Sequence, residues 1–143
     1  MVPPLVYLTR RFEFAAAHRV YNPAWSEAQN AEVFGPCSNP MGHGHNYTLE
    51  VTIGGTPDPE TGYVMDLRHL KKLVEETLLQ HLDHKHLNYD VPFLQGKIPS
   101  TENLIVAIWE ELERVLPPHV RLFRLRIWET NNNYFEYYGE KTD

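Results

Sequence analysis

The sequence has little cysteine and no long apolar run, and each shortage excludes a class of protein. Its 143 residues include one cysteine, Cys37, so no disulfide can form within the chain. That thiol is left for packing, metal ligation or chemistry. No apolar run approaches membrane-spanning length, and the first residues lack the basic and apolar regions of a signal peptide. We therefore expect a cytoplasmic protein with no membrane association.

Basic residues are also scarce. The chain has 13 lysines and arginines against 19 aspartates and glutamates, a net charge of −6. Such a balance argues against broad electrostatic binding to nucleic acid. A local cluster of cations or a metal would still allow an anionic small substrate. The length suits one domain with one core, residues 1–143.

Alternating apolar and polar residues predict four strands, and two longer stretches with a helical period predict helices. The expected strands are residues 6–19, 43–55, 120–129 and 134–138. The first helix should follow Asp66, a good N-cap, and run through Leu82. The second should begin at Ser100 or Thr101 and stop at Pro117. This order predicts an α+β domain, with an antiparallel four-stranded sheet and both helices on one face. Its open edges would favour association of several subunits.

Three histidines occupy positions on the predicted strands from which they can converge. His43 and His45 begin the apolar face of the second strand, and His18 ends that of the first. If these strands pair antiparallel as neighbours, the end of one lies beside the start of the other. Three neutral imidazoles suit Zn²⁺ and leave a fourth position for water or substrate. For the His43-Gly44-His45 segment alone, a surface turn would be the simpler interpretation.

Residues 20–42 form a long connection, which we expect to be an ordered loop over the site. Cys37 in this loop leaves two alternatives open. It is a fourth ligand that closes a structural zinc site, or an exposed thiol acting as a nucleophile or base.

Acidic residues supply further candidates. In Asp83-His84 a carboxylate can orient and charge an imidazole for proton transfer, although a solvated helix end is the simpler alternative. Glu129 shares the apolar side of its strand, where a ligand with adjacent N–H donors would pair with it, although a solvated strand end is the simpler alternative. For Thr101 and Glu102, simple capping of the second helix is the favoured interpretation.

Taken together, these motifs resemble the 6-pyruvoyltetrahydropterin synthase family, within a wider group that includes the 6-carboxytetrahydropterin synthases. The residues that carry the resemblance are Phe14-Ala-Ala-Ala-His18, Cys37-x5-His43-Gly-His45-Asn-Tyr47, Leu82-Asp83-His84-Lys85, Ser100-Thr101-Glu102-Asn103 and Trp128-Glu129-Thr130. The five-residue gap between Cys37 and His43 is similar to the pyruvoyl synthases.

The resemblance implies a tunnelling fold, in which trimers of four-stranded sheets close into a barrel and two trimers stack as a homo-hexamer. It implies Zn²⁺ on the three histidines, with Cys37 as general base. It also implies Asp83 and His84 as a second proton-transfer pair supplied by a neighbouring subunit. Glu129 would anchor a pterin ring, helped by Thr101 and Glu102.

The substrate implied is 7,8-dihydroneopterin triphosphate, converted to 6-pyruvoyl-tetrahydropterin with release of triphosphate. The alternatives are formation of a carboxy-pterin, another cleavage of the pterin side chain, and a zinc- or pterin-binding module without turnover. One departure stands out, because many pyruvoyl synthases have lysine before the cysteine and this chain has Pro36.

Overall fold

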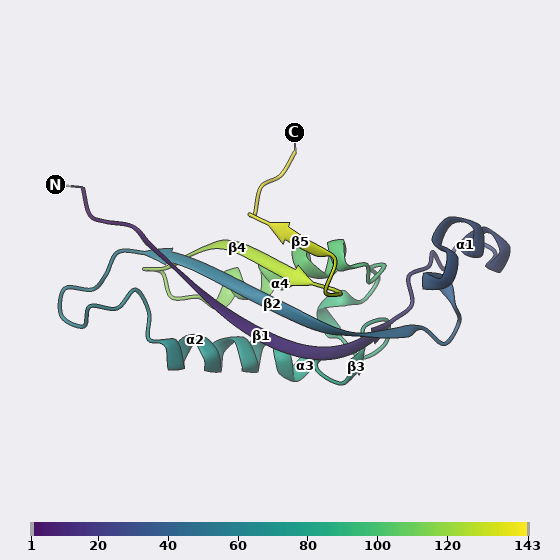
Figure 1. Ribbon diagram of the computed structural model, residues 1–143, viewed down its shortest axis with the longest axis horizontal. Coiled ribbons are helices and arrows are strands. Elements are labelled where there is room, and N and C mark those ends of the chain that lie inside the picture. The colour runs from purple at the N-terminus through teal and green to yellow at the C-terminus, as the bar shows by residue number, and fades with distance from the viewer. Residues whose placement is uncertain (1, 143) are drawn as a thin grey trace.

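The computed structural model describes residues 2–142, and its strands form one sheet in the order β3-β1-β2-β4-β5. The strands are β1 (Val6–His18), β2 (His43–Gly55), β3 (Lys85–His86), β4 (Arg121–Trp128) and β5 (Tyr134–Tyr137). The α-helices are α1 (Glu27–Phe34), α2 (Leu67–Val74), α3 (Gln80–Leu82) and α4 (Thr101–Val115). There are also two 3-10 turns, η1 (Gly35–Ser38) and η3 (Pro92–Leu94), and one π-helical turn, η2 (Glu75–Leu79), among the described residues. Figure 1 shows α1 apart from the other helices, beyond the end of the long β1–β2 ribbon.

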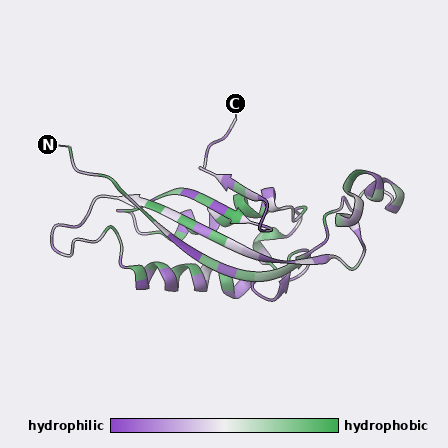
Figure 2. Ribbon diagram, in the orientation of Figure 1, coloured by the Kyte–Doolittle hydropathy of each residue, from purple (hydrophilic) through white to green (hydrophobic). Residues whose placement is uncertain are grey.

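β1 and β2 are the longest strands and form the frame of the molecule. They pair antiparallel without interruption from Val6 opposite Gly55 to His18 opposite His43. Figure 2 shows polar and apolar segments alternating along this ribbon, as expected for strands with one buried face. The predicted pairing of the two strands as neighbours is confirmed.

The four predicted strands are present and pair antiparallel, but the description of the sheet as four-stranded and antiparallel was wrong, because a fifth strand makes it mixed. β3 runs parallel to β1, with Lys85 opposite Ala16 and His86 opposite Ala17. Its two residues are too few to show an alternating pattern in the sequence. The strand forms because β1 leaves backbone groups free at its edge. The Ala15 carbonyl accepts from the His84 N–H at 2.6 Å, and the Ala17 carbonyl accepts from the Leu87 N–H at 2.8 Å.

The first predicted helix is present, but it is interrupted by the π-helical turn η2. Four of its side chains are fully buried at intervals of four residues: Leu70, Val74, Leu78 and Leu82. In a regular α-helix each such interval rotates the side chain by about 40°, so the last would turn away from the sheet. The wider η2 turn absorbs this drift and keeps all four against the core.

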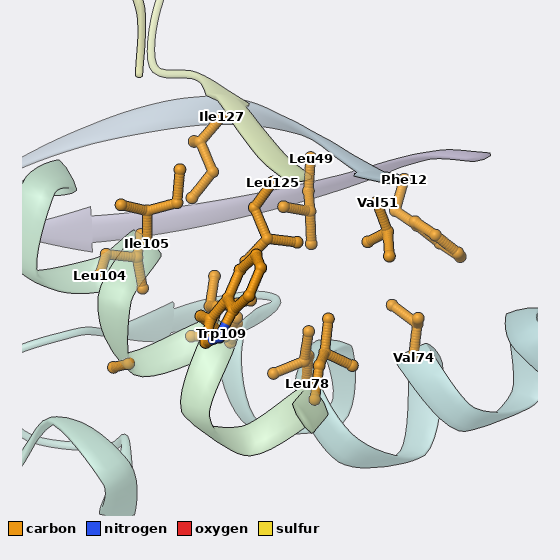
Figure 3. Close-up of a cluster of buried hydrophobic side chains, with 14 of the residues drawn as sticks. Phe12, Leu49, Val51, Val74, Leu78, Leu104, Ile105, Trp109, Leu125 and Ile127 are labelled. Atoms are coloured by element: carbon orange, nitrogen blue, oxygen red, sulfur yellow. The ribbon is translucent and has the colours of Figure 1, made fainter. Parts of the chain in front are cut away.

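The core lies between the sheet and the helices. Figure 3 shows Val74, Leu78 and Trp109 directed from the helices toward Leu49 and Leu125 on the sheet. The second predicted helix, α4, begins after the N-cap Ser100, whose hydroxyl accepts from the Asn103 N–H at 3.2 Å. Within residues 2–142, none of the helices combines the length and apolar character that crossing a membrane requires.

The long connection 20–42 is ordered, but it contains a helix that its sequence did not predict. Within α1 the buried residue is Asn30, so the helix lacks the apolar stripe by which amphipathic helices are recognised. Ser26 caps its start, and its end is at Gly35, which adopts a positive φ of 60°. η1 follows directly and carries Cys37.

Candidate metal centre and active site

The ends of β1 and β2 bring the three predicted histidines together. His18 is the last residue of β1 and lies directly opposite His43, the first residue of β2. His45 lies opposite Ala16 and two residues further along the same face. Before His43 the chain turns at Gly42, whose φ is +77°. A Cβ there would lie 2.9 Å from the His18 carbonyl oxygen, so the turn requires glycine.

The three imidazoles are close enough to share one ion. One ring nitrogen from each of His18, His43 and His45 lies within 4.8 Å of the others, and this group could hold a metal ion. The ring centroids of His18 and His43 are 4.6 Å apart, and those of His43 and His45 are 4.8 Å apart. The predicted convergence of the histidines is therefore confirmed.

The surroundings of His18 and His45 favour neutral imidazoles at these two positions. His18 Nδ1 lies 2.7 Å from the carbonyl oxygen of Pro99, which can accept but not donate, so Nδ1 carries the proton and Nε2 is left as an acceptor. Burial lowers the pKa of His18, although the hydrogen bond to the Pro99 carbonyl acts in the opposite direction. Burial also lowers the pKa of His45, although the charge of Glu129 acts to raise it. His45 Nε2 is buried and has no hydrogen-bond partner among the described residues. An unpaired imidazole nitrogen directed at two others fits a metal such as zinc.

The histidines open onto a cavity of about 500 Å³ that also contains Cys37. Its lining residues are His18, Val20, Phe34, Cys37, His43, His45, Ile98, Ser100, Thr101, Glu102, Asn103, Glu129 and Phe135. Cys37 is exposed, as expected for a reactive rather than a packed thiol. It does not belong to the metal-competent group, which consists of His18, His43 and His45. The arrangement places a thiol, three imidazoles and a carboxylate around one space.

Glu129 and Thr101 meet on the wall of this cavity. Glu129 follows β4 and Thr101 is the first residue of α4, and the Thr101 hydroxyl donates a hydrogen bond to Glu129 Oε2. Glu102 lines the same cavity but is exposed at the helix start. Two of the residues predicted for ligand recognition, Glu129 and Thr101, are thus in contact.

Tyr47 is a neighbour of this site that the sequence interpretation did not select. It is fully buried, its ring stacks on Phe14 at 4.8 Å, and it packs edge-on to His45 at 5.5 Å. Burial is the largest cause that raises the pKa of its hydroxyl, so the phenol stays neutral. Its place on the apolar face directly after the two histidines was the available signal.

Asp83 and His84 lie elsewhere in the chain's own fold. Asp83 Oδ1 accepts from the Ala15 N–H at 2.9 Å, which is the main reason the pKa of its carboxyl is lowered. His84 Nδ1 is 3.1 Å from the same oxygen, and its side chain is 83% exposed. His84 lines a second hollow of about 540 Å³ with Lys85, His86 and Asp90, not the cavity of Cys37. Within one chain, the pair is therefore separate from the thiol.

Comparison with known proteins gives a consistent result over nearly the whole chain. The family model described as 6-pyruvoyl tetrahydropterin synthase matches residues 7–140. The 6-pyruvoyl tetrahydrobiopterin synthase of Pongo abelii is 48% identical over 133 residues, which are 93% of this chain and 91% of that protein. The structure of Caenorhabditis elegans 6-pyruvoyl tetrahydropterin synthase has a TM-score of 0.88 and 38% identity, covering 98% of this chain and 100% of that one.

A further similarity has a different name. A dihydroneopterin monophosphate aldolase from Pyrococcus furiosus is 36% identical over 121 residues, which are 85% of this chain and 87% of that protein. The span matched by the family model contains every candidate residue from His18 to Glu129.

Proposed function

Since this chain belongs to the 6-pyruvoyl tetrahydropterin synthase family, we propose that it is a zinc-dependent lyase acting on 7,8-dihydroneopterin triphosphate. It would form 6-pyruvoyl-tetrahydropterin and release triphosphate. The observation that carries the proposal is the single cavity in which the three histidines, Cys37 and Glu129 face one another. A metal site alone would not distinguish an enzyme from a binding module, but a thiol and an anchoring carboxylate beside it favour turnover.

The metal is proposed to be zinc, held by His18, His43 and His45. Neutral imidazoles are good zinc ligands, and the Pro99 carbonyl already fixes the tautomer of His18 that leaves Nε2 free. When bound, zinc would supply Lewis acidity toward the hydroxyls of the substrate side chain and make the neighbouring C–H protons easier to remove.

Cys37 is proposed as the general base. Its thiolate would take a proton from the substrate side chain, which requires an exposed sulfur on the same cavity as the metal centre. Its exposure and its absence from the metal-competent group favour this role over that of a fourth ligand.

Glu129 is proposed to bind the pterin ring. A carboxylate can accept two parallel hydrogen bonds from the 2-amino group and the adjacent ring N–H of a pterin. Thr101 orients it by donating to Oε2, and this oxygen keeps a second lone pair for the ligand. Glu102, on the same wall, would assist.

Asp83 and His84 are proposed as the second proton-transfer pair, supplied by a neighbouring subunit of a homo-hexamer. Asp83 orients the His84 imidazole through the contact between its Oδ1 and His84 Nδ1. Two observations support supply from a neighbour: the His84 side chain is largely exposed, and it does not line the cavity of its own chain.

A second candidate reaction on a related substrate is a different cleavage of the pterin side chain. The relative from Pyrococcus furiosus favours it, because a chain 36% identical to this one is a dihydroneopterin monophosphate aldolase. The three-histidine centre would serve either reaction, and the position of the base relative to the side-chain carbons would decide the product.

Mass spectrometry of the products decides between these candidates. Zinc-loaded protein is incubated separately with 7,8-dihydroneopterin triphosphate and with dihydroneopterin monophosphate. Triphosphate and a pyruvoyl product support the lyase. A carboxylated product, or a shortened side chain from either substrate, identifies one of the alternatives. Tight binding without conversion would show that the protein is a pterin-binding module and contradict the proposal.

A further inference from the structure

Arg19 is an arginine buried directly beside the metal centre, and none of the proposed steps uses it. Its side chain is 9% exposed, although it carries a charge, and it follows His18 in the chain. A buried arginine is retained only where its charge and its donors are satisfied. Arg19 does not line the cavity of about 500 Å³, so it does not meet a ligand there.

The guanidinium of Arg19 is hydrogen-bonded to the segment that carries Cys37, which is α1 and η1. Nε donates to the carbonyl oxygen of Ser38 at 2.8 Å, in a buried contact one residue after Cys37. Nη2 donates to both carboxylate oxygens of Glu27 on α1, at 2.9 and 3.2 Å. The flat face of the group lies 3.8 Å from the ring centroid of Tyr21. One side chain thus contacts both parts of the segment, α1 and η1.

This segment has little apolar anchorage of its own. Within α1 the buried residue is Asn30, whose amide contacts backbone groups of the preceding turn, including the Asn22 N–H at 2.8 Å. The Val20 N–H donates to the Cys37 carbonyl at 2.9 Å. Polar contacts therefore fix the segment where most helices rely on a hydrophobic face.

The backbone of Arg19 is tied to Asn88, which lies in the turn after β3. Its N–H donates to Asn88 Oδ1 at 2.8 Å, and its carbonyl accepts from Asn88 Nδ2 at 2.9 Å. The residue before it, His18, ends β1 and belongs to the metal-competent group. Arg19 therefore connects the end of β1 and the turn after β3 to the segment carrying the thiol.

We propose that Arg19 is a positioning residue that fixes the α1–η1 segment so that Cys37 lies at a set place beside the three histidines. It acts through Ser38 and Glu27 and does not touch the substrate. This inference rests on the proposed function to the extent that Cys37 is the general base. Because catalysis depends on the placement of the base to within about 1 Å, loss of the anchor lowers turnover without removing the metal.

The test compares Arg19→Met, which keeps the length and loses the donors, with Arg19→Lys, which keeps the charge and loses the planar fork. Arg68→Met is the matched control, since that arginine is 90% exposed at the start of α2. Zinc per chain, kcat and KM are measured together with hydrogen exchange of residues 20–42 and 43–55.

Arg19→Met is expected to lower kcat about 10- to 100-fold with KM within about twofold of wild type and zinc content unchanged. Exchange at the Val20 N–H should accelerate at least about tenfold, while the amides of β2 keep their protection. The kcat of Arg19→Lys should lie between those of Arg19→Met and wild type, and the kcat of Arg68→Met should match that of wild type. If Arg19→Met does not fold, Glu27→Gln takes its place, with a smaller loss of kcat in the same pattern.

Two results would overturn the inference. One is a kcat within about twofold of wild type in the folded variants. The other is an equal loss of hydrogen-exchange protection in residues 20–42 and 43–55 together with loss of the zinc. That result would mark a general structural role for Arg19. A failure of the proposed function is distinguishable, because wild-type protein would then give no pyruvoyl product. The exchange measurement, which needs no turnover, would still report whether Arg19 holds the segment.

Discussion

At the scale of single residues, His18 shows how local contacts prepare a side chain for chemistry. Its Nδ1 donates to the Pro99 carbonyl, and its burial lowers the pKa of the ring. Burial favours the neutral ring, and the Pro99 contact places its proton on Nδ1, so the Nε2 lone pair is left directed toward His43 Nε2, 3.0 Å away. Protons therefore compete less with a metal at this residue than at an ordinary histidine.

Replacing Cys37 tests the choice between base and ligand. Cys37→Ala is expected to abolish turnover and to leave one zinc per chain, because the three histidines form the metal-competent group without the thiol. Product formation and metal content of the same preparation are measured, the latter by inductively coupled plasma mass spectrometry. Loss of the zinc would show instead that Cys37 is a ligand.

Glu129→Gln tests recognition of the pterin. The amide replaces one acceptor oxygen by a donor, so one hydrogen bond to the substrate would be lost. A hydrogen bond to a charged group contributes about 1.5–3 kcal/mol, which corresponds to a fall in kcat/KM of about 10- to 100-fold. Steady-state kinetics would measure it, with zinc content as the control. An unchanged kcat/KM would exclude Glu129 as the anchor.

Asp83 gives a pH dependence with a defined sign. The Ala15 N–H holds the pKa of its carboxyl below the ordinary value, so the folded state favours the charged form. Its stabilising contribution is present above the unfolded pKa of about 3.9 and is lost as the pH falls through the lower, folded pKa. Because the side chain is 43% exposed, the contribution should be less than about 1 kcal/mol.

The free energies of unfolding of metal-free wild type and Asp83→Asn, compared by urea denaturation from pH 6 downward, would test this. The variant keeps an acceptor for Ala15 but not the charge. The difference in free energy of unfolding between wild type and Asp83→Asn should become smaller below about pH 4. A difference that grows on acidification would contradict the assignment.

At the scale of elements, the first helix shows how packing overrides helical geometry. Its buried side chains recur every four residues, and the π-helical turn η2 keeps them in register with the sheet. Figure 3 places Val74 and Leu78 under β1 and β2. The helix leads directly to Asp83 and β3, so its register also sets where the Asp83-His84 pair lies along β1.

Leu78→Ala tests the importance of this register. Leu78 is fully buried in η2, so its truncation should lower the free energy of unfolding by about 2–5 kcal/mol. Glu76→Ala in the same turn is the control, and it should change stability by no more than about 0.5 kcal/mol because its side chain is 55% exposed. Urea denaturation at one protein concentration would measure both. Equal effects would show that η2 is not held by the core.

At the scale of the whole molecule, the proposed catalytic groups are divided between two hollows. Cys37 and the histidines line one, and His84 lines the other. β5 and most of β1 also leave a free edge among the described strands, where another chain can pair. The proposed homo-hexamer would bring the hollow of one subunit to that of its neighbour, and its mass would be about 100 kDa for chains of 16.7 kDa.

Mixing two inactive variants tests this arrangement. Cys37→Ala and His84→Ala are coexpressed in equal amounts, and the mixed oligomer is expected to recover up to about one quarter of wild-type activity. Recovery occurs because some sites combine an intact Cys37 with an intact His84 from the adjacent subunit. The matched control mixes Cys37→Ala with His45→Ala, which line the same cavity of one chain and should not recover. Absence of recovery in the first mixture would place both groups in one subunit.

Much of the fold and part of the site could be predicted because they depend on local patterns. The alternation in β1 and β2 fixed which face each histidine occupies, and antiparallel pairing then brought His18 to His43. The order of the four longer strands and the two main helices along the chain was predicted on the same basis. β3 and α1 were missed, because a two-residue strand has no period and α1 has no apolar face. β3 depends on hydrogen bonds to β1, which is distant in the chain, and α1 depends on side-chain hydrogen bonds of Arg19 and Asn30.

The amino-acid order by itself determined the two long strands, the main helices, the three histidines and the motifs of the family. These follow from side-chain periodicity and from residue types, which a linear chain displays. The tertiary structure alone decided that Thr101 donates to Glu129, that Arg19 reaches Ser38 and Glu27, and that His84 lies outside the cavity of Cys37. Those relations join residues through space, where burial and the need to satisfy each polar group select one arrangement among many.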